Sequence, residues 1–279
     1  MSDMIEKTFT VTSPARLDLS NIRGSVEIRP GEDGIVQVTA TKQTGHGDPE
    51  RTEIEMTQLA DGTVKVATRF PDGGWSWLIG SFPCPVDYVV RAPRGCSLKV
   101  NGVSNRAFAE GFEGEFTFNS VSGEVTLRNL IGPLSVKTVS GEMELADLTG
   151  NLRVNTVSGK ISGRRLSGPL HLDTVSGEVA LDESSLPSVD ATTVSGKMNC
   201  QTPLGEGPYR FNSVSGNVEL TVPPETRCSA ELQAVSGKLT TRLPVTFTSR
   251  QNGSQVVEVQ GGGVKVYLHS ISGDLSLAS

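Results

Sequence analysis

Hydrophobic and polar residues alternate along most of this chain, and from Val121 onward the phrase Val-Ser-Gly interrupts the alternation at regular intervals. The third residue of the phrase, counting an early variant that ends at Asn105, stands at positions 105, 123, 141, 159 and 177, in steps of 18. Later steps are 19, 20 and 21 residues, and the last, from Gly237 to Gly273, is 36, or twice 18. A fixed period of this length, with turn residues at one phase, predicts an architecture of stacked repeats.

Residues 124–141 illustrate one repeat. Val125 and Leu127 alternate with polar residues in a first short strand, and a second short strand follows the turn at Gly132-Pro133. Neither stretch is long enough for a helix. We therefore predict an all-β fold over residues 101–279: a single-stranded parallel β-helix, or β-solenoid, with coils of about 18 residues. Each strand should pair in parallel with its counterpart one coil away, and a degenerate coil near Gly253 would fill the doubled last step.

Equivalent residues of stacked coils should form columns. The residue two places after each glycine is apolar and is expected to point inward: Val125, Met143, Ile161, Val179, Met198, Val218, Leu239 and Leu275. The Ser and Gly of the phrase should form a structural ladder at one corner: Ser122, Gly123, Ser140, Gly141, Ser158, Gly159, Ser176, Gly177, Ser195, Gly196, Ser215, Gly216, Ser236 and Gly237. Glycine tolerates a positive φ at such a corner, and serine can bond the local backbone.

Residues 1–100 lack the period and are predicted to form a separate antiparallel β head, or cap. Two alternating stretches joined by Ala60-Asp61-Gly62 indicate a hairpin. Residues 21–28 resemble a single copy of the repeat phrase and would form a first coil, separated from the others by an insertion.

These features together resemble a known bacterial family, the putative-adhesin family of domains of unknown function. The resemblance rests on the Val-Ser-Gly coils, on Val86–Pro93 and on Gly24–Ile28, and it covers the chain from about residue 8 to the end. It implies a β-solenoid, and it offers no catalytic residues to carry over. The family's adhesin label rests on architecture.

Composition and charge exclude several classes of function. The net charge is −6 with no basic run, which argues against nucleic-acid binding. The absence of a signal-like apolar stretch and of a long apolar run predicts a cytoplasmic protein with no integral membrane segment. The four cysteines are spaced 12, 104 and 28 residues apart, so we expect idle thiols and neither a metal nor another cofactor.

A search for catalytic residues finds only dispersed candidates. Asp173, Glu178 and Asp190 do not share one phase of the repeat, and the three histidines are far apart in sequence. We therefore predict a non-enzymatic protein, with a polysaccharide-active enzyme as the third alternative to the two hypotheses that follow.

The first hypothesis is a scaffold that assembles end to end. The chain stops directly after a strand, so an uncapped last coil around Leu275 and Leu277 would expose an edge to another copy. In the second, a monomeric module binds a protein or envelope partner through the loop that holds Trp75, Trp77 and Leu78. The same tryptophans would instead be buried if this loop covers the open end of the solenoid.

Overall fold

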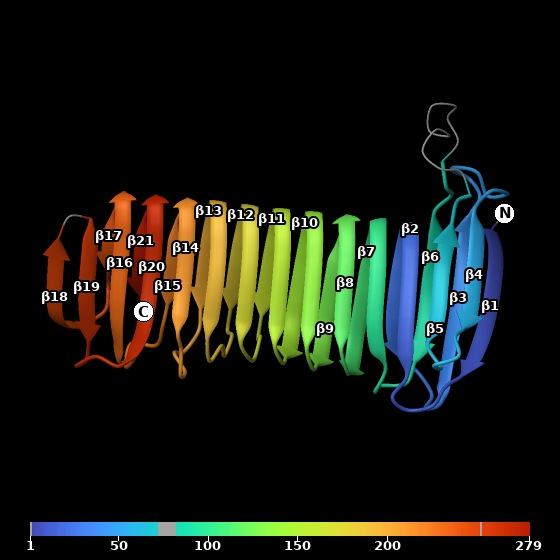
Figure 1. The fold of residues 1–279 in the computed structure, drawn as a ribbon, viewed down its shortest axis with the longest axis horizontal. Helices are drawn as coiled ribbons and strands as arrows, with labels where there is room; N and C mark the ends of the chain where they lie inside the picture. The colour runs from blue at the N-terminus through green and yellow to red at the C-terminus, as the bar shows by residue number, and fades with distance from the viewer. Residues whose placement is uncertain (1, 72–81, 252) are drawn as a thin grey trace. The chain divides into compact units, whose positions relative to one another are not determined.

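The computed structural model describes residues 2–71, 82–251 and 253–279. Every regular element in these ranges is a β-strand, which confirms the predicted all-β fold. The described residues accordingly contain no helix long and apolar enough to cross a membrane. The chain divides into two compact units, Met1–Gly141 and Glu142–Ser279, which are described separately (Figure 1). The domain boundary predicted at residue 100 stays a prediction.

The first unit contains the head and the first coils. Its strands are β1 (Ser2–Thr10), β2 (Arg16–Pro30), β3 (Ile35–Gln43), β4 (Glu53–Gln58), β5 (Val64–Arg69), β6 (Val86–Ala92), β7 (Ser97–Glu113), β8 (Phe116–Ser122), β9 (Val125–Ile131) and the first part of β10 (Leu134–Thr149). β3 pairs antiparallel with β1 and β6, and β4 and β5 form the expected hairpin. β2 instead pairs in parallel with β5, β6 and β7, with Val26 opposite Ala107. Residues 21–28 therefore belong to a first coil, as predicted.

The coils of this unit repeat every 18 residues. Phe116 of β8 is in register with Leu98 of β7 and with Leu134 of β10, and β9 pairs in parallel with the later part of β7. Leu98, Phe116 and Leu134 are all buried. Stacked apolar columns thus form the core between two parallel strand layers, as the period predicts.

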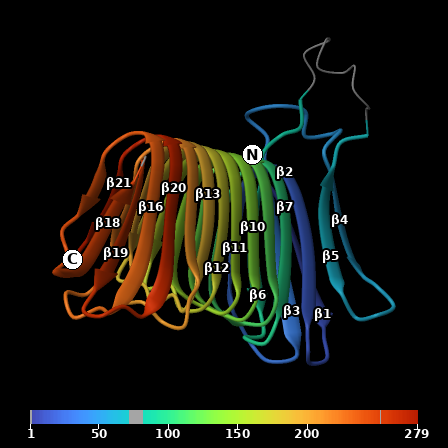
Figure 2. The same ribbon diagram turned by 60° about the vertical axis from the view of Figure 1, so that its left-hand side comes forward.

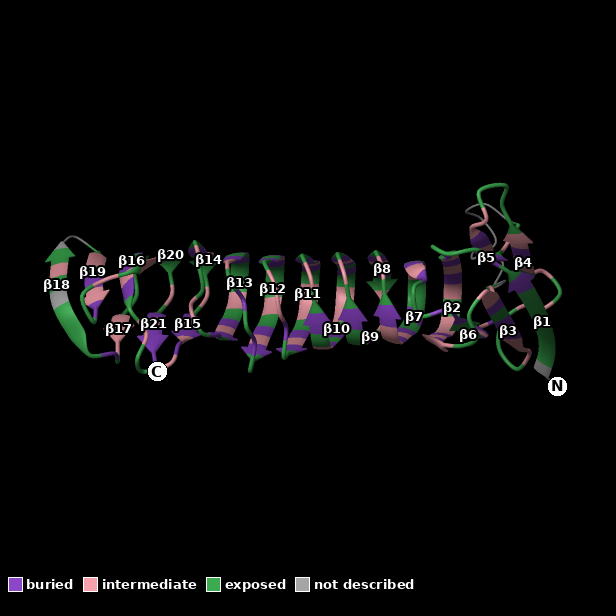
Figure 3. Ribbon diagram, turned by 90° about the horizontal axis from the view of Figure 1, so that it is seen from below, coloured by how far each residue is buried: buried purple, intermediate pink, exposed green. Residues whose placement is uncertain are grey.

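The second unit consists of the remaining coils. Its strands are the rest of β10, β11 (Leu152–Arg164), β12 (Leu170–Asp182), β13 (Val189–Gln201), β14 (Tyr209–Ser215), β15 (Val218–Thr221), β16 (Cys228–Ser236), β17 (Leu239–Thr241), β18 (Val245–Gln251), β19 (Ser254–Val259), β20 (Val264–Ser272) and β21 (Leu275–Ala278). β11 to β14 pair in parallel one coil apart, so that Ile161, Val179 and Met198 stack in one buried column. Bands of buried and exposed residues alternate along these strands (Figure 3).

The last coil does not stack in sequence order. β20 lies between β14 and β16, and β21 lies between β15 and β17 (Figures 1 and 2). The residues around Gly253 form the antiparallel hairpin β18–β19, which pairs with the other side of β16. The prediction of a degenerate coil there was wrong. A strand that carries the Val-Ser-Gly phrase can pair with any other strand that carries it. The spacing of 36 residues between Gly237 and Gly273 therefore does not show which strands become neighbours.

The expected exposed edge at the last coil was also wrong. Leu275 and Leu277 are fully buried, because β21 has a hydrogen-bonded strand on each side. The premise for end-to-end assembly through this coil therefore fails.

The corner glycines have a steric reason that the sequence analysis missed. A Cβ at Gly177 would lie 2.2 Å from the carbonyl oxygen of Gly159, one coil away. Most of the corner glycines have the predicted positive φ (Gly123, Gly141, Gly159, Gly196 and Gly237), whereas Gly177 and Gly216 do not. At Gly177 and Gly216 the close approach of successive coils, and not the backbone dihedral, therefore explains the glycine, whereas at Gly141 both reasons apply.

Candidate functional site

The outward side chains of six adjacent strands form the candidate site. Along β12, the buried residues Leu170, Leu172 and Thr174 alternate with His171, Asp173 and Val175, which face outward. The same alternation recurs on the strands that lie side by side in the order β11, β12, β13, β14, β20 and β16. Three outward columns therefore run across this sheet face.

The column nearest the corner is apolar. It consists of the first residue of each repeat phrase and is named the valine column: Val157, Val175, Val194, Val214, Ile271 and Val235. Their exposed fractions range from 43% for Val194 to 81% for Val235. Single exposed apolar residues are ordinary, but a continuous stripe of them is typical of a surface that contacts a partner.

Two polar columns lie beside the valine column on the same face. The middle column is Asn155, Asp173, Thr192, Asn212, His269 and Gln233. The outer column is Arg153, His171, Asp190, Arg210, Tyr267 and Glu231. The three columns together are named the valine face.

Contacts within one strand and between neighbouring strands hold several polar side chains of this face. Nε2 of His171 lies 3.0 Å from Oδ2 of Asp173, and its Nδ1 lies 3.7 Å from Oδ2 of Asp190. The guanidinium of Arg210 lies 6.0 Å from the centre of the Tyr267 ring. These contacts restrain side chains that would otherwise lose more rotamer freedom on meeting a partner.

The cluster of His171, Asp173 and Asp190 is open to solvent. Its imidazole and the two carboxylates are each about half exposed, so water weakens their interactions. No group of three or more His, Cys, Asp or Glu side chains in the described part of the chain is arranged to hold a metal ion. The arrangement suits recognition of a partner by charge and hydrogen bonding at an exposed surface.

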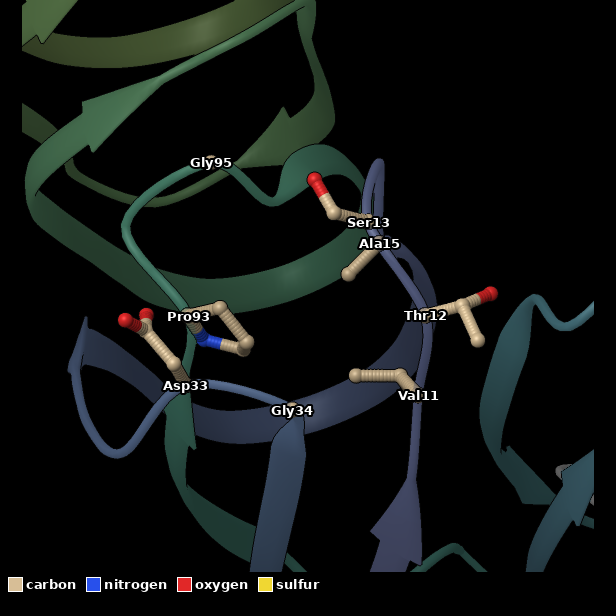
Figure 4. A pocket seen from close by; sticks show the side chains of 8 residues that line it. All are labelled: Val11, Thr12, Ser13, Ala15, Asp33, Gly34, Pro93 and Gly95. Atoms are coloured by element: carbon tan, nitrogen blue, oxygen red, sulfur yellow. The ribbon is translucent and has the colours of Figure 1, made fainter.

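Two hollows lie away from the valine face, and few charged side chains line them. One, of about 290 Å³ in the first unit, is lined by Val11, Thr12, Ser13, Ala15, Asp33, Gly34, Pro93 and Gly95 (Figure 4). Asp33 is the single charged side chain among these eight residues. The other, of about 440 Å³ in the second unit, is lined largely by turn residues such as Thr202, Val222 and Pro224. Neither brings together acid, base and nucleophile.

The residues predicted to matter are placed as follows. Trp75, Trp77 and Leu78 lie outside the described residues. The ladder serines are in register in two series, Ser104, Ser122 and Ser140 in the first unit, and Ser158, Ser176, Ser195, Ser215, Ser272 and Ser236 in the second. Ser272 thus separates Ser215 from Ser236, which follows from the inserted last coil. The serine ladder lies next to the valine column at the corner.

The four cysteines are buried free thiols. Burial raises the pKa of Cys96 and of Cys200 to about 12, and that of Cys228 to about 11. A thiol that stays protonated is a poor nucleophile, so these three side chains act as small apolar core residues.

The exposure of the valine column was missed in the sequence analysis, although its signal was present. Val175 stands two residues after Asp173 and therefore has the outward parity of that strand, whereas Thr174 has the inward parity. Counting parity through the repeat phrase would have separated the exposed valines from the buried apolar columns.

The fold and this surface define a class of protein: a parallel β-solenoid with an exposed apolar column on one sheet face. The family described as Toastrack DUF4097 matches residues 15–278, and the chain belongs to it. A comparison with curated proteins found no match.

Solved structures from bacteria match most of this chain at low sequence identity. One from Parabacteroides distasonis, described as a putative lipid binding protein, is 11% identical, covers 98% of this chain and 96% of its own, and has a TM-score of 0.54. One from Bacteroides fragilis, described as a putative adhesin, is 12% identical over 99% of this chain and 96% of its own, with a TM-score of 0.33. One from Clostridium sporogenes, described as a putative cell adhesion protein, is 8% identical over 99% of both chains, with a TM-score of 0.26. The first of these supports the fold alone.

Proposed function

We propose that this chain is a non-enzymatic interaction module that binds a protein partner through the valine face. The valine column carries the proposal, because six adjacent strands expose a β-branched side chain at the same position. Water around such a stripe is released when a partner covers it, which favours association. The polar columns beside it match the polar surround of protein interfaces.

The charges of the face favour a protein over a lipid surface. Arg153 and Arg210 alternate with Asp190 and Glu231 in the outer column, so the face has both signs. Binding to an anionic membrane surface depends on clusters of basic residues instead. Binding through Trp75 and Trp77 stays a prediction, as does the cytoplasmic location, which cell fractionation tests.

Two matched double variants test the proposal. Val175→Lys with Val194→Lys places charges in the valine column, and Ala180→Lys with Asn199→Lys places the same charges on β12 and β13 beyond the corner. Each tagged protein is used to capture partners from a lysate of the source cell, and the retained proteins are quantified by mass spectrometry. Circular dichroism checks that both variants are folded.

We expect proteins retained by the native chain to be retained by the Ala180/Asn199 variant and lost from the Val175/Val194 variant. Equal retention by the two variants would show that binding occurs elsewhere. Retention by the native chain no greater than that by beads alone would refute an interaction module.

A further inference from the structure

The columns of the valine face in the second unit can be compared with their own reverse order. Six strands lie in the order β11, β12, β13, β14, β20 and β16, and a line along the strands between β13 and β14 has three of them on each side (Figure 1). A second copy turned by 180° about this line would place β11 over β16, β12 over β20 and β13 over β14. The turn preserves position along the strand, so each column meets itself in reverse order.

The outer column is complementary to its own reverse. The facing pairs are Arg153 with Glu231, Asp190 with Arg210, and His171 with Tyr267. Two pairs join opposite charges and the third joins two aromatic rings, and two-fold symmetry makes each pair twice. Like charges do not face one another anywhere in this column.

The other two columns are complementary in the same way. In the middle column the facing pairs are Asn155 with Gln233, Asp173 with His269, and Thr192 with Asn212, and all have hydrogen-bonding groups. In the valine column the facing pairs are Val157 with Val235, Val175 with Ile271, and Val194 with Val214. Apolar side chains therefore meet apolar side chains, and polar side chains meet polar ones.

The column just past the corner shows that this match is not a general property of the repeat. It consists of Lys160, Glu178, Lys197, Asn217, Asp274 and Lys238. Reversed on itself, it would place Lys160 against Lys238 and Glu178 against Asp274, which are like-charge pairs. This column lies on the other side of the Ser-Gly corner, away from the valine face.

We infer that the valine face of the second unit binds the same face of a second copy of this chain, about a two-fold axis that lies along the strands between β13 and β14. This inference rests on the proposed function and names its partner. Charge complementarity of the outer column carries it, and the matching apolar column supplies the driving force.

The size of the face fits a reversible dimer. Six strands about 4.8 Å apart span about 24 Å, and the four residue steps from Arg153 to Val157 span about 13 Å. Two such faces together cover roughly 600 Å², which is smaller than the interfaces of stable complexes and is in the range of weak, transient contacts. We therefore expect a weak dimer that forms only at high protein concentration.

Charge-reversal variants provide a test in which two broken interfaces repair each other. Asp190→Arg places two arginines at the central facing positions, and Arg210→Asp places two aspartates there. Each variant alone repels its own copy, whereas a mixture of the two restores both opposite-charge pairs in a heterodimer. Lys197→Glu, past the corner, is the matched control.

Sedimentation equilibrium of the full chain over a wide concentration range measures the association. We expect a native dimer, at least a tenfold rise in dissociation constant for Asp190→Arg and for Arg210→Asp, and a mixture within about threefold of native. The Lys197→Glu variant should dimerise as the native chain does. Asp190 and Arg210 also lie side by side within each chain, and mixing two variants cannot repair that contact. Restored association in the mixture therefore shows that the single variants lost an interface between chains and not their fold.

Three results would overturn the inference: a native monomer at every concentration, a mixture that stays monomeric, or disruption by Lys197→Glu. A native monomer combined with lysate partners lost specifically from the Val175/Val194 variant would refute the dimer and leave the proposed function standing. Failure of both experiments would refute both.

Discussion

Gly177→Ala tests the close approach of successive coils. The new Cβ would lie 2.2 Å from the carbonyl oxygen of Gly159, whereas real Cβ contacts stay above 3.0 Å. Both atoms belong to strands paired in register, so relief requires that β11 and β12 separate by about 0.8 Å at this corner, the shortfall between these two distances. The obstacle is backbone, which cannot move aside as a side chain would.

The expected cost follows from two contributions. Overpacking of a tight interior site typically costs about 1–3 kcal/mol. Stretching the strands at the corner weakens about two ladder hydrogen bonds, each with a net contribution of about 1 kcal/mol. Gly177→Ala should therefore lower the free energy of unfolding by about 3–5 kcal/mol, measured by urea unfolding with circular dichroism. Hydrogen exchange should show the loss concentrated in β11, β12 and β13.

Two control glycines separate the contact from the backbone dihedral. Gly62 has φ of +83° and no heavy atom within 4 Å of an added Cβ, so Gly62→Ala should cost about 1–2 kcal/mol from conformation alone. Gly95 has equally open space and no positive φ, so Gly95→Ala should be neutral or stabilising by up to about 1 kcal/mol. A cost for Gly177→Ala no larger than that for Gly62→Ala would refute the steric explanation.

Three further predictions concern stability. Leu277→Ala should destabilise the fold by about 2–5 kcal/mol in urea unfolding, because β21 is buried between two strands; a loss below about 0.5 kcal/mol would contradict this position. Val175→Thr should change the free energy of unfolding by no more than about 0.5 kcal/mol, because the side chain faces outward; a core-like loss would show otherwise. The Cys200 thiol has its pKa raised by burial from 9.0 to about 12, so its contribution to stability is complete below about pH 9 and is lost as pH rises towards 12. The melting temperature should therefore fall less between about pH 8 and pH 10.5 for Cys200→Ala than for the native chain, and equal falls would contradict the shift.

Local periodicity predicted most of the fold. Alternation identified the buried columns such as Ile161, Val179 and Met198, and the step of 18 placed their neighbours one coil away. These features depend on residues close in sequence, where side-chain parity and turn chemistry act directly.

Features that depend on the choice between equivalent partners could not be predicted. β20 inserts between β14 and β16 because any copy of the repeat phrase offers the same pairing edge, so sequence order does not determine stacking order. The hairpin around Gly253 has the alternation of a coil, and only its antiparallel pairing with β16 distinguishes it.

The sequence contains the signal for one part of the candidate site, the outward direction of the valines, but not for the other, the order of the strands. The parity of Val175 places it outward, yet its apolar character favours a buried position, and hydrophobicity alone gives the wrong answer there. The complementarity of the outer column could not be predicted from the sequence. It depends on the insertion of β20, which places Tyr267 between Arg210 and Glu231.

Photo-crosslinking tests most directly whether the valine face contacts a partner. Benzoylphenylalanine is placed at Val175 on this face, or at Ala180 on the other outward side of the same strand, and living source cells are irradiated. We expect a covalent adduct of defined mass from position 175 and none from position 180, with twice the chain mass if the partner is a second copy. No adduct from position 175, or equal adducts from both positions, would contradict the account.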